Sequence, residues 1–325
     1  MTAAQADPDL DALAEHVRNH PALRAKAEIG LVTEIIGGGS WLHGPGDDGA
    51  VIPMNDGAKA GHVIACGEAL LPAFVANDPY GAGFAAVLAN VNDLAAMGAT
   101  PLGIVDTLVG TRDVAREALR GMRAASMLYD VPLVGGHLTI HEGPPALSAF
   151  GIGQADAVLS STYVSPGQSL IVASCTDGTM RTDFPFFRSF EQRGAQMAGD
   201  VRVFATLAGT GACVAAKDVS MAGLVGSLAM LLEWSRLGVT LNLDALPRPD
   251  GVPLAAWLTC FPAYSFLLCA PAGREQDVLS AFHSRGLEAA VVGTIDGSSL
   301  LALRSGDSEA TVLDLAVTGI TRLEH

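Results

Sequence analysis

The chain has 325 residues, of which 50% are hydrophobic, and a formal net charge of −15 at pH 7. This length and apolar content are enough to bury a sizeable core, and they predict a globular protein of two domains. With only 16% charged residues, the chain does not have the composition of a disordered protein. The negative charge excludes a general nucleic-acid binder or lipid-surface binder, because both need a positive field.

The N-terminal sequence MTAAQADPDLDALAEHVRNH is acidic and interrupted by charges. It lacks the basic start and apolar middle of a secretion signal, so we interpret residues 1–29 as a helical segment on the protein surface. No apolar run reaches the roughly 20 residues that a membrane span needs. Five cysteines, none of them in a C-x-x-C pattern, favour buried thiols in a reducing compartment. We therefore expect a cytoplasmic protein that does not bind membranes.

Helices and strands alternate along the first half of the chain, which indicates an α/β or α+β fold. Residues 79–99 have the spacing of a helix built from small apolar residues, and Gly98 is a normal helix end. Residues 112–130 have the pattern of an amphipathic helix. Strands are predicted at residues 49–52, 61–66, 101–110, 131–136 and 145–156.

The second half repeats this mixture after turn residues at 158–167, which we interpret as a linker. The predicted domains are therefore residues 30–160 and 165–322. Residues 323–325, LEH, resemble the remnant of a vector-encoded tag and take no part in the functional argument. Helices are predicted at 221–237 and 274–286, and strands from about 169 and at 239–243, 263–271, 289–295 and 299–304.

Four short stretches combine small residues with an acid or a histidine at the end of an apolar run. Small residues allow a ligand to approach the backbone, and acids can hold a hard cation such as Mg²⁺. One such stretch has little meaning, but four suggest a shared site. They are GPGDDGAVI (44–52), NVNDLAAMGATP (90–101), LVGGHLT (133–139) and KDVSMAGLVG (217–226).

The adjacent acids Asp47 and Asp48 repel each other unless something compensates their charges. Mg²⁺ on its way to a phosphate is one explanation, and a polar turn built from Gly, Pro and Asp is the other. Asp93 raises the same question, because a carboxylate within an apolar helix is costly to bury without a partner. It can equally cap a turn or lie at a solvated edge.

The other two stretches also have simpler explanations. Gly135 and Gly136 can form a plain turn, and His137 can be an ordinary hydrogen-bonded histidine. Asp218 precedes a predicted helix and can be its N-terminal capping acid. His137 and His141 lie four residues apart, which on a helix would suit zinc, but this segment has the pattern of a strand or loop.

In this order, GDDGAVI, NDLAAMGATP, GGHLT and DVSMAGLVG resemble the motifs of the aminoimidazole ribonucleotide synthase (AIR synthase) superfamily. The superfamily includes thiamine-monophosphate kinase, selenophosphate synthetase and the hydrogenase-maturation ATPase. The resemblance runs from about residue 30 to residue 300. GGHLT and DVSMAGLVG look most like the selenophosphate synthetase versions of these motifs.

The resemblance implies a two-domain AIR synthase-like fold. Its N-terminal domain would pair across a homodimer into a β-barrel, and its C-terminal domain would be an α/β sandwich. The resemblance also implies ATP bound in a cleft with several Mg²⁺ ions, and a small-molecule substrate. Metal ions spread over the phosphates would stabilise the charge that develops during phosphoryl transfer.

Carried over by position, the resemblance assigns metal binding to Asp47, Asp93 and Asp218, the acids of the first, second and fourth motifs. Glu68, in CGEALLP, takes the place of a family aspartate and would be a further metal ligand on a longer side chain. His137 stands where the kinase-like relatives have a third acid. The residues expected to contact ATP or its phosphates are Gly46, Asp47, Asp48, Asn90, Asn92, Asp93, Gly135, Gly136 and His137.

Two departures from the family narrow the expected activity. Selenophosphate synthetases carry a Cys or selenocysteine and a Lys in a glycine-rich N-terminal loop, whereas AEIGLVTEIIGGGSWLHG has no cysteine here. The hydrogenase-maturation members end in a reactive cysteine, whereas this chain ends in VTGITRLEH. Selenium chemistry and carbamoyl transfer are therefore disfavoured, and the substrate motifs of the purine enzyme are not found.

We therefore expect an ATP- and Mg²⁺-dependent enzyme that phosphorylates or activates a small metabolite. The alternative is a nucleotide-binding protein with degraded catalysis that regulates or docks to a partner enzyme. His137 in place of an acid and the missing nucleophile favour that alternative. Because cations are scarce, Arg24, Lys26, Arg181 and Lys217 are candidate phosphate partners, with surface salt bridges as the other explanation.

Overall fold

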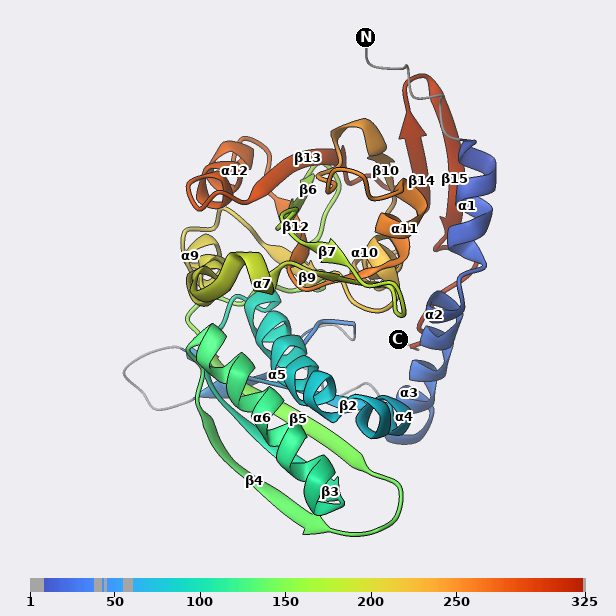
Figure 1. Cartoon of the computed structure of the whole chain (residues 1–325). Coiled ribbons are helices and arrows are strands. Elements are labelled where there is room, and N and C mark those ends of the chain that lie inside the picture. The colour runs from blue at the N-terminus through green and yellow to red at the C-terminus, as the bar shows by residue number, and fades with distance from the viewer. Residues whose placement is uncertain (1–8, 38–42, 44–45, 55–60, 324–325) are drawn as a thin grey trace. The chain divides into compact units, whose positions relative to one another are not determined.

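The structure is a computed structural model whose contacts divide the chain into two compact units (Figure 1). The residues that it describes are 9–37, 43, 46–54 and 61–323. Unit 1 consists of Met1–Asp47, Ser160–Gln192 and Ala212–His325. Unit 2 consists of Asp48–Leu159 and Arg193–Gly211. The chain therefore enters unit 2 twice, which differs from the contiguous domains expected from the sequence.

A five-stranded mixed sheet, ordered β1-β2-β5-β3-β4, forms the centre of unit 2. Neighbouring strands are antiparallel except β3 and β4, which are parallel. Buried and exposed residues alternate along β5, so one face of the sheet is covered and the other is not. The strands that the structure describes form an open sheet rather than a closed barrel, with β1 and β4 at its edges. The bounds are β1 (Ala50–Met54), β2 (Gly61–Leu70), β3 (Thr100–Gly110), β4 (Leu133–Ile140) and β5 (Ala146–Ala155).

Helix α5 (Pro79–Ala96) covers one face of this sheet and confirms the helix predicted there (Figure 1). The Asp78 carboxylate caps its N-terminus by accepting a hydrogen bond from the Gly81 backbone N–H at 2.8 Å. The helix ends just before Gly98, whose φ of +73° is the left-handed conformation that glycine adopts readily. Local sequence signals therefore fix both ends of the helix that carries Asp93.

Helix α6 (Arg112–Tyr129) packs against α5 and confirms the predicted amphipathic helix. Glycines allow the two helices to approach closely. A Cβ atom on Gly83 would lie 2.0 Å from the Ala118 carbonyl oxygen, and one on Gly121 would lie 1.9 Å from the Tyr80 carbonyl oxygen. Any larger residue at either glycine would force the helices apart.

A segment from the second half of the chain completes unit 2. Helices α8 (Met197–Asp200) and α9 (Val203–Gly209) pack against α6 and α5, respectively, and the short helix α4 (Pro72–Asn77) precedes α5. The Arg202 guanidinium donates to the carbonyl oxygens of Tyr129 and Asp130, each at 2.9 Å. These carbonyls lie at the C-terminus of α6, where helix carbonyls lack partners within the helix.

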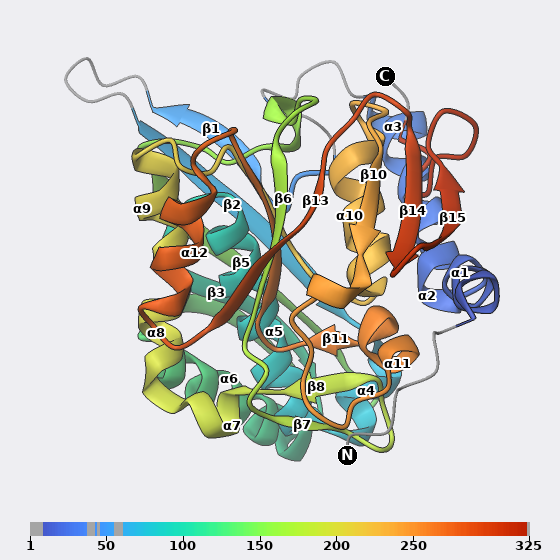
Figure 2. The same ribbon diagram turned by 90° about the horizontal axis from the view of Figure 1, so that it is seen from above.

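Unit 1 contains a four-stranded antiparallel sheet ordered β13-β6-β12-β9, and Figure 2 shows β6 and β13 running side by side. Its strands are β6 (Ser169–Ser174), β9 (Ala215–Asp218), β12 (Ser265–Ala270) and β13 (Glu288–Thr294). Two three-stranded sheets consist of β10 (Val239–Asn242), β14 (Leu300–Ser305) and β15 (Ser308–Asp314), and of β7 (Thr179–Met180), β8 (Phe186–Arg188) and β11 (Phe261–Pro262). The helices are α1 (Leu10–Arg18), α2 (Pro21–Arg24), α3 (Leu31–Ile36), α7 (Phe190–Arg193), α10 (Gly223–Glu233), α11 (Leu254–Thr259) and α12 (Glu275–His283).

The predicted N-terminal helix is α1, whose first turn is capped by the Asp9 carboxylate. Its apolar side chains recur at helical spacing and enter the main core of unit 1 beside β15. The Arg18 guanidinium adds bonds to the carbonyl oxygens of Thr311 and Val312 on β15, each at 2.8 Å. The buried residues of α1 are Leu10, Leu13, Ala14 and Val17.

The five cysteines are thiols rather than disulfides, as predicted; four are buried and Cys66 is half-buried. Within the described part of the chain, no helix combines the length and apolarity needed to cross a bilayer. The cytoplasmic location stays a prediction.

Candidate metal and phosphate site

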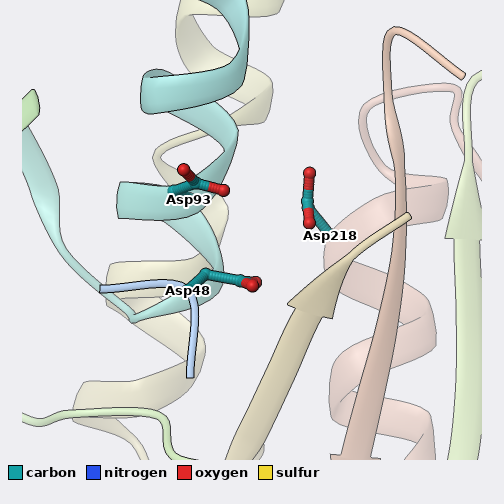
Figure 3. Close-up of side chains that lie close together, drawn as sticks. All are labelled: Asp48, Asp93 and Asp218. Atoms are coloured by element: carbon teal, nitrogen blue, oxygen red, sulfur yellow. The ribbon is translucent and has the colours of Figure 1, made fainter. Parts of the chain in front are cut away.

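Two acids of the first and second motifs lie together in unit 2. A carboxylate oxygen of Asp48 lies within 4.8 Å of one from Asp93. Figure 3 shows Asp93 on its helix and Asp48 on the loop before β1, with both carboxylates directed to the same side. Both side chains are half-buried. Two partly desolvated carboxylates at this separation repel each other, and a cation between them would remove that repulsion.

Asn90 fixes the part of α5 that presents Asp93. Its side-chain amide donates to the Ala149 carbonyl oxygen at 3.2 Å, and its side-chain oxygen accepts from the Gly151 N–H at 2.7 Å. Both partners lie on β5, so Asn90 ties the helix to the centre of the sheet. Asn90 and Asn92 are 0% and 1% exposed. These bonds explain Asn90 without a ligand, and the phosphate contacts expected for the two asparagines stay predictions.

Asp47 points its carboxylate at two serines of unit 1. One oxygen accepts from the Ser160 hydroxyl at 2.5 Å. The other accepts from the Ser161 backbone N–H at 2.7 Å and the Ser161 hydroxyl at 2.6 Å. A carboxylate offers about four lone-pair positions, and these bonds use three of them. The metal role expected for Asp47 stays a prediction, while Asp48 is the acid of this motif that lies near Asp93.

Asp218 is the last residue of β9 in unit 1 and is only 4% exposed. The following helix, α10, has Ala222 as its N-cap and no side-chain cap. Asp218 is therefore not the capping acid that its sequence position allowed. The preceding residue, Lys217, is 3% exposed, and its ammonium group donates to the Gly46 carbonyl oxygen at 3.4 Å. Unit 1 thus holds a buried cation against Gly46, next to Asp47.

Glu68 is exposed on β2 and belongs to one row of residues across the sheet. Ala149 on β5 pairs with both Glu68 and Asp106, and Asp106 pairs with Gly136 on β4. Paired residues share a face of the sheet, and this is the face of Ile64 on β2, which packs with Leu94 of α5. Burial raises the pKa of Asp106 above its ordinary value. The metal role of Glu68 stays a prediction.

The GGH motif forms the middle of β4, an edge strand, and not a turn. His137 is exposed and pairs with Thr107, so it lies on the face opposite to Asp106 and α5. A Cβ atom on Gly136 would lie 2.3 Å from an Asp106 carboxylate oxygen, which explains why a glycine occurs there. The strand conformation also removes the helical spacing that a zinc site at His137 and His141 would need. The phosphate roles of Gly135, Gly136 and His137 stay predictions.

The candidate phosphate-binding cations divide into two groups. Arg181 forms a two-point ion pair with Asp183 at 2.9 and 2.6 Å, and the guanidinium of Arg24 bonds to Asn19. The pairing also lowers the pKa of Asp183 to about 2. These contacts agree with the surface-salt-bridge explanation for Arg181. Lys217 is different because it is buried and its ammonium group donates to the Gly46 carbonyl oxygen of the first motif.

Sequence reasoning did not single out Ser160, Ser161 or Asp106. The two serines lie in a stretch interpreted as a linker, and a paired serine after a strand is too common a pattern to indicate an anchor. Asp106 interrupts an otherwise apolar strand, which is a usable signal because strand interiors rarely contain acids. The sequence alone could not predict that Asp106 pairs with Gly136 on the neighbouring strand, because that pairing depends on the strand register.

Comparisons with known proteins agree with this architecture. Residues 46–155 match the model of the AIR synthase related protein, N-terminal domain, and residues 188–305 match the C-terminal domain. The uncharacterized protein sll0787 of Synechocystis sp. is 35% identical over 281 residues, covering 85% of each chain. The chain therefore belongs to the AIR synthase related protein family.

More distant relatives include the phosphoribosylformylglycinamidine synthase subunit PurL. That of Synechococcus elongatus is 28% identical over 281 residues, covering 78% of this chain but 36% of PurL. The structure of T. maritima PurL complexed with ATP has a TM-score of 0.70 at 20% identity, covering 82% of this chain and 46% of that one. The structure of AaThiL complexed with AMPPCP and TMP has a TM-score of 0.65 at 16% identity, covering 88% of this chain and 96% of AaThiL. The chain thus has the two-domain AIR synthase fold and spans about half or less of the PurL chains it matches.

Proposed function

We propose that this protein is an ATP- and Mg²⁺-dependent enzyme that phosphorylates or activates a small metabolite. The observation that supports this most directly is the pair of carboxylates from Asp48 and Asp93. The fold of the chain also resembles that of T. maritima PurL, whose structure was determined with ATP bound. Another structure of T. maritima PurL is complexed with FGAR, which favours a small-molecule substrate here as well.

The donor chemistry of the site fits Mg²⁺. Carboxylate oxygens are preferred magnesium ligands, and at bond lengths of about 2.0–2.1 Å two ligands of one ion lie up to roughly 4.2 Å apart. The carboxylate oxygens of Asp48 and Asp93 lie within 4.8 Å of each other, so a small rotation would bring both onto one ion. The family resemblance also assigns metal binding to Asp218 and Glu68, and we propose the same role for both.

Each proposed ligand has a defined chemical task. Asp48 and Asp93 would hold Mg²⁺, which would supply positive charge against the charge that develops during phosphoryl transfer. The carboxylates hold the metal and take no proton themselves. The fixed position of α5, set by Asn90 and the Asp78 cap, keeps Asp93 in place. Because the protein would mainly position the reactants and neutralise charge, phosphoryl transfer of this kind would need no covalent nucleophile.

ATP consumption separates this proposal from its alternative. With a panel of small acids, alcohols and amines as acceptors, we expect Mg²⁺-dependent ADP formation above the rate without acceptor. A second candidate function, a nucleotide-binding partner protein, is favoured by the similarity to a HypE–HypF complex structure, with a TM-score of 0.66. If the protein binds ATP with Mg²⁺ but forms no ADP with any acceptor, the partner role is the better description.

We further propose a homodimer built on the open face of the unit 2 sheet. Phe150 lies on this face over Gly67 and is 43% exposed, and Val134 and Ile52 are 59% and 51% exposed. A contiguous apolar sheet face and an unpaired edge strand are typical of an interface. A second copy of the chain, placed face to face, would cover both and form the barrel that the family resemblance implies.

Phe150→Asp should therefore convert the dimer to a monomer, because a charge would be buried at the centre of the interface. Sedimentation velocity measures the change in mass. Val317→Asp is the matched control, since Val317 is 80% exposed in unit 1, outside this face, and should leave the dimer intact. A wild-type protein that sediments as a monomer, or a Phe150→Asp variant that stays dimeric, would contradict the proposed interface.

A further inference from the structure

The exposed side of α6 in unit 2 is rich in positive charge, although the chain as a whole is acidic. The chain has 19 lysines and arginines against 34 acids. Four of these cations lie on α6, all of them arginines and all exposed, whereas the helix has only the two acids Asp113 and Glu117. The four cations are Arg112, Arg116, Arg120 and Arg123.

These arginines lie on one side of the helix. At about 3.6 residues per turn they fall within roughly 80° of its circumference. Leu119 and Met127, which are 37% and 71% exposed, lie on the same side. The buried residues of α6 lie on its other side, where the helix packs against α5 (Figure 1). The four arginines with Leu119 and Met127 are called the α6 stripe below, and together they extend over about 22 Å.

Only half of the positive charge in the α6 stripe is compensated locally. Arg116 pairs with Asp113 and Arg120 pairs with Glu117, each at 2.7 Å. Arg112 and Arg123 form no hydrogen bond or ion pair with any residue that the structure describes. Arg112 is also the first residue of the helix, where the positive end of the helix dipole disfavours a cation. Helix stability therefore does not explain why a cation occurs there.

The composition of the α6 stripe fits a protein partner better than a nucleic acid. A nucleic-acid strand carries one phosphate per roughly 3.4 Å, so some of its phosphates would face the carboxylates of Asp113 and Glu117. The net charge of −15 would also repel it. Arginine and methionine are enriched in protein interfaces, whereas lysine is depleted. The exposed side chains of Leu119 and Met127 offer the apolar contacts that such an interface needs.

We propose that the α6 stripe docks an acidic amphipathic helix of a partner protein. Carboxylates four residues apart on that helix would repeat at about 6 Å, the spacing of Arg112, Arg116 and Arg120 along α6. Apolar side chains beside the acidic row would cover Leu119 and Met127. The argument for this occupant is charge complementarity, since two of the arginines lack an acid of their own. The inference goes beyond the proposed enzymatic function and requires neither metal nor nucleotide.

Fluorescence anisotropy with four labelled probes tests this inference on the full chain. The main probe is a helical peptide of about 20 residues, long enough to form a helix, with a row of glutamates beside a row of leucines. The other probes are a peptide of the same composition in scrambled order, a single-stranded DNA of similar length and a phosphatidylserine vesicle. The variant Arg112→Gln/Arg123→Gln removes the two uncompensated charges. Its matched control is Arg236→Gln/Arg304→Gln, which removes two exposed arginines of unit 1.

We expect the amphipathic peptide to bind the wild-type protein and the control variant equally. Arg112→Gln/Arg123→Gln should weaken this binding about tenfold or more, because arginines are frequent hot spots of interfaces. Its melting temperature should not fall, since neither side chain has a partner to lose and Arg112 opposes the helix dipole. Binding of Mg²⁺ with nucleotide should not change either, so a failure of the proposed enzymatic function leaves this inference standing.

Three results would overturn the proposed docking surface. The wild-type protein binds no amphipathic peptide, or it binds the scrambled peptide equally well, or Arg112→Gln/Arg123→Gln binds the peptide like wild type. Tighter binding of the DNA or the vesicle, lost in the same variant, would also contradict a protein partner, because the α6 stripe would then be a surface for phosphate groups.

Discussion

Asp93→Asn is expected to lower the affinity for the Mg²⁺ complex of ATP by about 100-fold or more, since even residues that only orient metal ligands typically contribute 10–100-fold. The substitution removes a negative charge but keeps the size and shape of the side chain. The position of α5 should not change, because its anchors are Asn90 and the Asp78 cap. Titration of a non-hydrolysable ATP analogue, with Mg²⁺ and with a chelator, measures the effect.

Asp113→Asn is the matched control for this variant. Asp113 lies on α6 of the same unit, its side chain is 86% exposed, and it pairs with the surface side chain Arg116 at 2.7 Å. It should bind the nucleotide complex like wild type. If Asp93→Asn also keeps wild-type affinity, the metal site does not include α5, whatever the fold of the protein.

Arg193→Met is expected to lower the free energy of unfolding by about 3–5 kcal/mol, because it leaves a buried carboxylate without its partner. Arg193 bonds to both oxygens of Asp200, at 2.7 and 3.0 Å, and the two side chains are 10% and 0% exposed. The pair links two residues within the segment 193–211 of unit 2. Urea unfolding, followed by circular dichroism, measures the change.

Arg120→Met provides the comparison, since Arg120 pairs with Glu117 at 2.7 Å on the exposed surface of α6. Surface pairs contribute about 0–1 kcal/mol, so the expected loss is small. The double variant Arg193→Met/Asp200→Leu should recover part of the stability, because it removes the buried charge together with its partner. Equal losses for Arg193→Met and Arg120→Met would show that the buried pair stabilises the protein no more than a surface pair does.

The sequence predicted the elements whose signals are local. Helices α5 and α6 have their caps, their apolar spacing and their end signals within the same twenty residues, and both were placed correctly. Strand β15 was missed because acids and small polar residues interrupt its apolar residues, although Ala310, Val312 and Leu313 enter the core of unit 1. The return of residues 193–211 to unit 2 was also missed. It depends on bonds such as that of Arg202 to Tyr129, which are 73 residues apart.

In the candidate site, too, local sequence signals were informative, whereas contacts between distant residues could not be predicted. The motifs identified the loop, the helix and the strand that carry Asp48, Asp93 and Asp218, because acids beside small residues are unusual in apolar surroundings. They could not decide which of the adjacent aspartates faces Asp93. Nor could they predict the bonds from Ser160 and Ser161 to Asp47, which span more than a hundred residues. They also could not show that His137 lies on the face opposite to α5, because a strand's facing depends on its register.

The central claim is that the acids of this chain bind a nucleotide through Mg²⁺. Calorimetric titration of the wild-type protein with a non-hydrolysable ATP analogue tests it directly, with Mg²⁺ and then with a chelator in its place. We predict binding with Mg²⁺ that is lost with the chelator and in Asp48→Asn. Binding of equal strength under all three conditions, or no binding under any of them, would contradict the account.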